Sequence, residues 1–243
     1  MGKRPAGKAA LLISGAAVIA GCGRAPAPVP YPSPAGTTTA AGYYSAQVAS
    51  SGEHRATLAI DSGATTLTVT AAAIPGSLLR TSAPGNSSLR PQLVSSPNQV
   101  QLSLLSTGQR GPSAVSVQLS TAVTWQLEFN GGTSQTVLNL TNGKVAGLDF
   151  EAGSGLIQIA LPRPSGAVMI TLGGGASQVS LTVPGGVPIR LRLDAGASAA
   201  TLAGQAHLSL SRGTVLSSPG WAEAANKYDV DAPAGIGEIS VVG

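Results

Sequence analysis

The stretch Leu148-Asp-Phe-Glu-Ala-Gly153 decides the fold, because it recurs with few changes along the chain. Counting from its last glycine, apolar residues stand five and three positions before it. They stand again four and six positions after it, at Ile157 and Ile159. Close copies of this pattern end at Gly132, Gly175 and Gly196. The four glycines are therefore 21, 22 and 21 residues apart, which indicates a structural repeat.

Each apolar pair has a period of two, which is typical of a strand with one buried side. The acidic or amide residue and the glycine between two pairs suit a tight turn, since Asp and Asn bond nearby backbone and Gly accepts positive φ. The pattern also surrounds Gly63, and weaker copies surround Gly85, Gly108 and Gly235. One period near residues 217–220 is skipped or degenerate.

A period in this range predicts stacked repeats that contact only their neighbours. We expect residues 43–243 to form a single all-β domain, a β-solenoid with rungs of about 22 residues. Each rung would add ~4.8 Å, the distance between paired strands. Strands every ~11 residues also fit an antiparallel β-sandwich, which stays open as the alternative.

The N-terminus carries basic residues (Lys3, Arg4 and Lys8) followed by an apolar run over 9–20 that is too short to span a bilayer. The next residues, Ile19-Ala20-Gly21-Cys22, resemble the lipobox of bacterial lipoproteins. This resemblance implies cleavage before Cys22 and attachment of lipid to its thiol. We therefore expect residues 1–21 to be a lipoprotein signal peptide. Residues 22–42 are then a lipidated cysteine with a Pro/Thr/Ala-rich tether.

The formal charge of +4 does not indicate a nucleic-acid partner. Three of the fourteen basic residues lie in the signal segment, which leaves eleven against ten acidic residues. The remaining basic residues are scattered, whereas a strip of phosphate contacts needs clustered positive charge. Because Cys22 is the single cysteine, an internal disulfide is excluded as well.

No constellation of residues predicts an enzyme, a cofactor or a metal site. The two histidines, His54 and His207, stand beside ordinary strand or loop residues, and we expect them at the surface or on an edge. Acidic and amide residues recur at the turns and could form a calcium-binding row, but Gly173 interrupts their register. These residues are Asp61, Asn130, Glu151 and Asp194. The aromatic residues Trp125, Trp221 and Tyr228 are expected to pack the rungs or cap an end rather than form a carbohydrate-stacking face.

The run from about Leu138 to Val242 resembles the toast-rack, adhesin-like group of bacterial envelope domains and is similar to the C-terminal domain of LiaF-like proteins. Three features carry the likeness: Gly173-Gly-Gly-Ala-Ser177, the step Leu181-Thr-Val-Pro-Gly-Gly-Val-Pro188, and a closing segment from Ser218 to Gly237. The resemblance implies a toast-rack fold and supplies no catalytic residues. Regulatory members of that group are usually fused to transmembrane helices, whereas this chain carries the lipobox-like motif.

Two functions remain open from the sequence. One is a non-catalytic structural or adhesin-like surface lipoprotein that is exported, lipid-anchored on the bacterial membrane and facing outward. The other is a sensor or accessory lipoprotein that modulates a cell-envelope stress response. The expected partners are the membrane, through the lipid on Cys22, and an envelope or surface protein or glycan. A lipid-carrying cavity would need a continuous internal pocket, whereas rungs of Leu, Val and Ile should pack solid.

Overall fold

The computed structural model describes residues 38–40 and 42–243, and all its regular elements are strands. Within these described ranges, no helix is long and apolar enough to cross a bilayer. The lipobox-like residues Ile19, Ala20, Gly21 and Cys22 lie outside the described residues, as does most of the proposed tether. The expected all-β class is confirmed.

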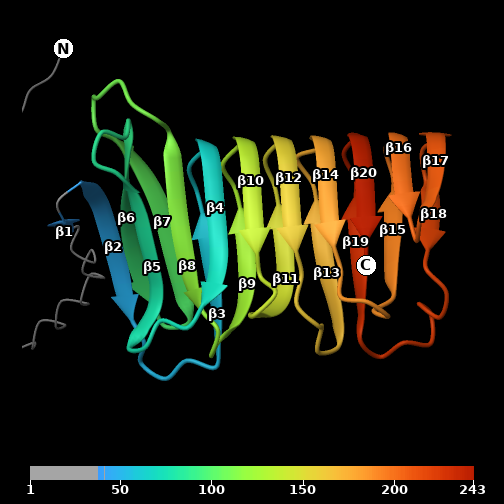
Figure 1. Cartoon of the computed structure of the whole chain (residues 1–243), viewed down its shortest axis with the longest axis horizontal. Coiled ribbons are helices and arrows are strands. Elements are labelled where there is room, and N and C mark those ends of the chain that lie inside the picture. Colours follow the sequence, from blue (N-terminus) through green and yellow to red (C-terminus); the bar gives the residue numbers. More distant parts are fainter. Residues whose placement is uncertain (1–37, 41) are drawn as a thin grey trace, which may run out of the picture. The chain divides into compact units, whose positions relative to one another are not determined.

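The strands form two sheets (Figure 1), which we call the long sheet and the short sheet. In spatial order, the long sheet contains β1 (Thr38–Ala40), β2 (Tyr43–Ala49), β5 (Ser77–Pro84), β8 (Ala114–Ser120), β4 (Ala64–Ala72), β10 (Thr133–Asn139), β12 (Ser154–Ala160), β14 (Ala176–Thr182), β20 (Ile236–Val242), β16 (Ala197–Leu202) and β17 (Gln205–Leu210). The short sheet contains β18 (Thr214–Ser217), β15 (Ile189–Leu193), β19 (Lys227–Ala232), β13 (Ala167–Leu172), β11 (Lys144–Phe150), β9 (Thr124–Phe129), β3 (Arg55–Ile60), β7 (Gln99–Ser106) and β6 (Leu89–Ser96).

A regular rung is a short-sheet strand, a glycine-containing corner and a long-sheet strand. Successive rungs pair in parallel in both sheets, so that Thr133 aligns with Ser154, and Ser154 with Ala176. Each of these residues follows one of the repeat glycines. Parallel pairing between rungs is the solenoid arrangement, and it excludes the antiparallel sandwich.

The core lies between the two sheets and is built from the apolar pairs of the repeat. Strand β12 alternates buried and exposed residues, with Ile157 and Ile159 both at most 2% exposed. Phe129 and Phe150, in equivalent positions of adjacent rungs, stack with ring centroids 4.4 Å apart and planes inclined by 8°. Alternation along the strands and stacking between rungs therefore give one continuous hydrophobic core.

The corner glycines are required mainly by the close approach of neighbouring rungs. A Cβ on Gly131 would lie 2.1 Å from the carbonyl carbon of Ser62, and a Cβ on Gly174 would lie 2.0 Å from that of Ala152. Positive φ was the expected reason for glycine at these corners. Among the repeat glycines it applies to Gly108, Gly175 and Gly196, with φ of 75°, 73° and 86°, and not to Gly63.

The order of rungs departs from the sequence order at both ends of the stack. Strand β4 pairs directly with β10, because the segment around Gly85 and Gly108 is placed on the other side of β4. Strands β5 and β6 cross the corner near Gly85 in the reverse direction, and β5 pairs antiparallel with β8. At the other end, β19 and β20 lie between the rungs β13–β14 and β15–β16.

The missing period near residues 217–220 is also explained by this topology. After β16 the chain turns back within the long sheet as β17, and then crosses to the short sheet as β18. Both strands pair antiparallel to their neighbours and close the stack (Figure 1). At this end the stack therefore closes with two antiparallel strands instead of a further parallel rung.

Candidate interaction surface

The outer surfaces of the two sheets differ in charge. Charged residues are concentrated in the strands of the short sheet: Arg55, Arg90, Glu128, Lys144, Asp149, Arg190, Arg192, Lys227, Asp229 and Asp231. The strands of the long sheet contain Arg80 and Glu238 as their charged residues. We call the outer surface of the long sheet the polar face and that of the short sheet the charged face.

The polar face is built from three in-register rows of outward side chains, each crossing the strands. Because side chains alternate along a strand, every second residue of a long-sheet strand joins a row. The central row runs through Ser45, Ser82, Ser116, Thr68, Val137, Gln158, Ser180, Ser240, Thr201 and Ala206. Most of its members are hydroxyl or amide side chains, and none is charged.

The flanking rows are polar over β2 to β10 and contain apolar residues farther along the sheet. One row includes Val242, which is 59% exposed, and the other includes Leu156 and Leu208, of which Leu208 is 76% exposed. One of them begins with Gln47, Arg80, Gln118 and Thr70 and continues to Asn139 on β10. The other contains Thr66, Gln135 and Gln178, and Tyr43 lies at its β2 end with 55% exposure. The polar face therefore presents neutral hydrogen-bonding groups along its central row and over β2 to β10, with exposed apolar residues toward its β17 end.

A hollow of about 450 Å³ lies on the polar face over β2, β5 and β8. Its lining includes three serines of the central row, Ser45, Ser82 and Ser116, together with the two glutamines Gln47 and Gln118. Arg80 also lines it, and the Arg80 Nε donates a hydrogen bond of 3.1 Å to the Ser77 Oγ. The hollow combines hydroxyl, amide and guanidinium groups within one concave area.

On the charged face, ion pairs join adjacent strands. Arg190 on β15 donates a bidentate pair of hydrogen bonds to Asp229 on β19, and the Nε–Oδ1 distance is 2.8 Å. This hydrogen-bonded carboxylate raises the pKa of the Arg190 guanidinium. The Arg190 Cζ also lies 3.7 Å from the ring centroid of Trp221, and the Lys227 Nζ lies 4.2 Å from it. These cation–π contacts give Trp221 a structural role on the loop before β19.

The other two aromatic candidates are buried. Trp125 is 1% exposed and its Nε1 donates to the Ser120 carbonyl at 3.0 Å. Tyr228 is fully buried and its hydroxyl donates to the Pro162 carbonyl at 2.7 Å. Trp125 and Tyr228 therefore pack within the rungs, whereas Trp221 is half-buried on the loop before β19, and the three do not form a common carbohydrate-stacking face.

The remaining candidates from the sequence are dispersed. His54 is exposed before β3, and His207 is half-buried on the edge strand β17. The Asn130 Nδ2 donates to the Asp61 Oδ1 at 2.8 Å across neighbouring rungs. In the same register, Gly173 and Pro233 separate Glu151 from Asp194. Within the described ranges, no three His, Cys, Asp or Glu side chains are placed to hold a metal ion.

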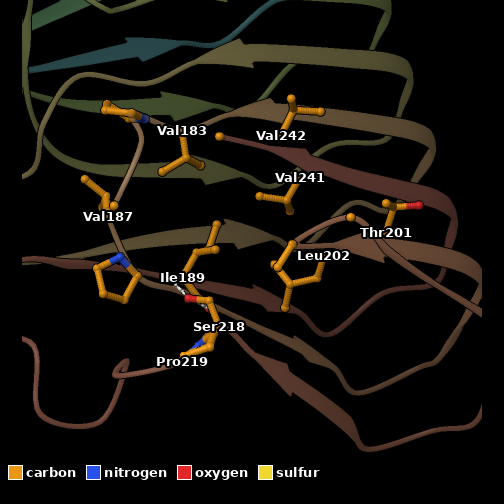
Figure 2. Close-up of a pocket in the computed structure, with 15 residues that line it drawn as sticks. Val183, Val187, Ile189, Thr201, Leu202, Ser218, Pro219, Val241 and Val242 are labelled. Atoms are coloured by element: carbon orange, nitrogen blue, oxygen red, sulfur yellow. Dashed lines mark hydrogen bonds between the residues drawn. The ribbon is translucent and has the colours of Figure 1, made fainter.

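An apolar groove of about 470 Å³ lies at the corner opposite the glycine turns (Figure 2). Strand β20 stays paired with β14 as far as Val242, but its ladder with β16 ends at Ser240 and Thr201. Strands β20 and β16 diverge beyond this point. Four apolar residues line the gap between them: Val183, Ile189, Leu202 and Val241. Its lining contains no charged side chain. Sequence reasoning missed this groove because it depends on which rungs become neighbours.

Comparison with known proteins agrees with this architecture. A family model described as the N-terminal domain of toast_rack, DUF2154, matches residues 38–182, which is more than half of the chain. The crystal structure of a "putative cell adhesion protein" from Clostridium sporogenes ATCC 15579 has a TM-score of 0.60 at 14% identity, covering 82% of this chain and 97% of that one. At this identity the likeness concerns the fold. No curated protein matches the sequence.

Proposed function

This chain belongs to the family of the toast-rack N-terminal domain, and from that premise we propose that it is a lipid-anchored surface lipoprotein whose polar face binds a component of the cell envelope. The toast-rack family and the adhesion-protein fold fit a non-catalytic domain facing the envelope. The observation that carries the proposal is the contrast between the two outer surfaces. Charge supports solubility on the short sheet, whereas the long sheet keeps neutral hydrogen-bonding groups across successive rungs.

The lipid anchor is tested separately from the polar face. We expect the Cys22→Ser variant to move from the membrane fraction to the soluble fraction, because the thiol that would carry the lipid is gone. Fractionation of cells expressing either form at equal level measures this change. If the variant stays in the membrane fraction, the anchor proposal is wrong.

The polar face is tested by adding charge to its central row. Thr68 and Ser180 lie on that row and are half-buried at the surface, so glutamates there place two charges among neutral groups. The control is the double variant Thr57→Glu/Thr171→Glu, whose sites lie on the charged face. Retention of the Cys22→Ser protein on isolated cell envelopes should fall about tenfold for Thr68→Glu/Ser180→Glu, a loss of about 1.4 kcal/mol. Equal retention of the two double variants would contradict the proposal.

The apolar groove favours a second candidate, an accessory lipoprotein that senses envelope stress by binding a membrane partner. An open apolar groove without charged side chains is a common feature of interaction sites. A photo-crosslinking amino acid at Val187, on the groove wall, should then capture one membrane protein reproducibly in living cells. The same substitution at Val215, exposed on the charged face, serves as the control. Identical products from both positions would argue against a sensor role for the groove.

A further inference from the structure

We propose that the polar face binds an extended, uncharged glycan that carries hydroxyl and amide groups; this inference rests on the proposed function and names the partner of its surface. Serine and threonine hydroxyls donate and accept hydrogen bonds, and glutamine amides do both as well. The sugar hydroxyls and N-acetyl groups of a neutral glycan are complementary to these groups. The strands of the polar face contain two charged residues of opposite sign, Arg80 and Glu238. A face with so little net charge suits a neutral polymer.

The direction of the rows favours a linear polymer. The central row crosses the long sheet at right angles to the strands, and equivalent side chains repeat every ~4.8 Å. A chain of similar units lying along the stack meets the same kind of group on successive rungs (Figure 1). Many weak contacts on one chain then combine, since each further contact is intramolecular.

A protein partner fits this face less well. Protein interfaces obtain most of their binding energy from a few buried aromatic, arginine or large apolar anchors near the centre. The large exposed residues of the polar face lie away from its centre: Tyr43 on β2, Leu208 on the edge strand β17 and Val242 on β20. A polyanion is excluded as well, because the described long-sheet strands offer it Arg80 as their single cation.

The hollow over β2, β5 and β8 is the part of the face best shaped to hold a sugar ring. Its serines Ser82 and Ser116 lie side by side, and Gln118 pairs in register with Arg80. Short hydroxyl side chains of the central row and the longer amide and guanidinium side chains of the next row line it together. Tyr43 follows at the end of the flanking row and can stack against an adjoining ring.

The test uses the full chain purified in detergent micelles, with soluble β-1,4-linked oligomers of N-acetylglucosamine as the probe. Isothermal titration calorimetry should show affinity rising at least tenfold from the dimer to the hexamer. The affinity of the hexamer should be the same at low and high salt, because no ion pair forms. Ser116→Glu should weaken hexamer binding about tenfold, whereas Thr171→Glu on the charged face should not. Gln118→Ala, a milder change in the same hollow, gives a second reading if Ser116→Glu disturbs folding.

Failure of this inference is distinguishable from failure of the proposed function. If the oligomers do not bind, but envelope retention persists and is abolished by protease treatment of the envelopes, the partner is a protein and the glycan inference is overturned. If retention does not depend on the polar face, the proposed function itself fails. Affinity that is independent of oligomer length, or equal in Ser116→Glu and Thr171→Glu, would overturn the extended binding mode.

Discussion

Two buried threonines on the long sheet differ in whether their hydroxyl has a partner. Thr81 on β5 is 3% exposed, and its Oγ1 has no hydrogen-bond partner among the described residues. Thr136 on β10 is 1% exposed, and its Oγ1 lies 2.7 Å from the Thr133 Oγ1. We expect Thr81→Val to raise the free energy of unfolding by about 1 kcal/mol, because it removes an unsatisfied buried hydroxyl.

Thr136→Val is the matched control for that change. It removes a satisfied hydroxyl of the same kind and should lower the free energy of unfolding by about 1 kcal/mol. Urea denaturation followed by circular dichroism measures both variants. Equal effects of the two substitutions would show that the hydroxyl of Thr81 is bonded in solution.

The buried hydroxyl of Tyr228 makes stability depend on alkaline pH. Burial raises the pKa of Tyr228 above its ordinary value near 10. In the unfolded chain this phenol ionises above pH ~10, whereas in the folded domain it stays protonated. Its contribution is therefore complete below pH ~10 and is lost as the pH rises toward the folded pKa. Tyr228→Phe should lower stability at neutral pH, through loss of the bond to Pro162, and should flatten the decline between pH 10 and 11 in thermal melts.

Individual side chains could be predicted from the sequence only where the repeat determines them. Ile157, Val179 and Ile239 are buried because they occupy one position of the repeat. The polar face consists of the residues between them, so its position was contained in the same pattern. The difference in charge between the two outer surfaces could not be predicted from the pattern, because it depends on which strands share a sheet.

Among the structural elements, the corners carry the most specific sequence requirement. Gly174 has ordinary φ, yet an added Cβ would overlap the backbone of Ala152 in the preceding rung. Gly185 also has ordinary φ, and an added Cβ there meets nothing within 4 Å. Gly174→Ala should cost about 2–3 kcal/mol because the rungs must separate. Gly185→Ala should be neutral or slightly stabilising.

Urea denaturation of the two alanine variants checks this prediction. A cost at Gly174 no larger than that at Gly185 would mean that the corner relaxes without disturbing the stack. The strands themselves followed from alternation, but the pairing of β4 with β10 did not, since pairing depends on contacts between distant segments.

At the scale of the whole domain, each of the four outermost strands is poorly suited to pairing with another chain. Strand β1 has three residues and β18 has four. Strand β17 contains Ser209 at a φ of 52°, which interrupts its ladder. Strand β6 contains Pro91, opposite Leu104. Short, bent or proline-containing edges prevent the sheets from extending into fibres.

Pro91 provides the test of this edge protection. The Leu104 N–H donates toward Ser62 on the β3 side, so the Pro91 nitrogen faces the open edge of β6. Pro91→Thr restores an N–H there and should increase self-association, measured by sedimentation velocity over a range of concentrations. Pro84→Thr on β5, which is not an edge strand, is the control and should sediment like the unchanged protein. If Pro91→Thr sediments like the unchanged protein, Pro91 is not what prevents association through the edge of β6.

The placement of β19 and β20 has a consequence for how the chain is made. Synthesis from the N-terminus makes these two strands after β15 and β16, yet their positions are interior ones between β13–β14 and β15–β16. The rung β15–β16 is therefore made before its parallel neighbour and stays unpaired on that side until β19 and β20 have been synthesised. A premature stop codon before Lys227 would not merely shorten the stack at one tip. It would remove the strands β19 and β20 from inside the stack, so that β15 to β18 would lose their pairing with the rung β13–β14.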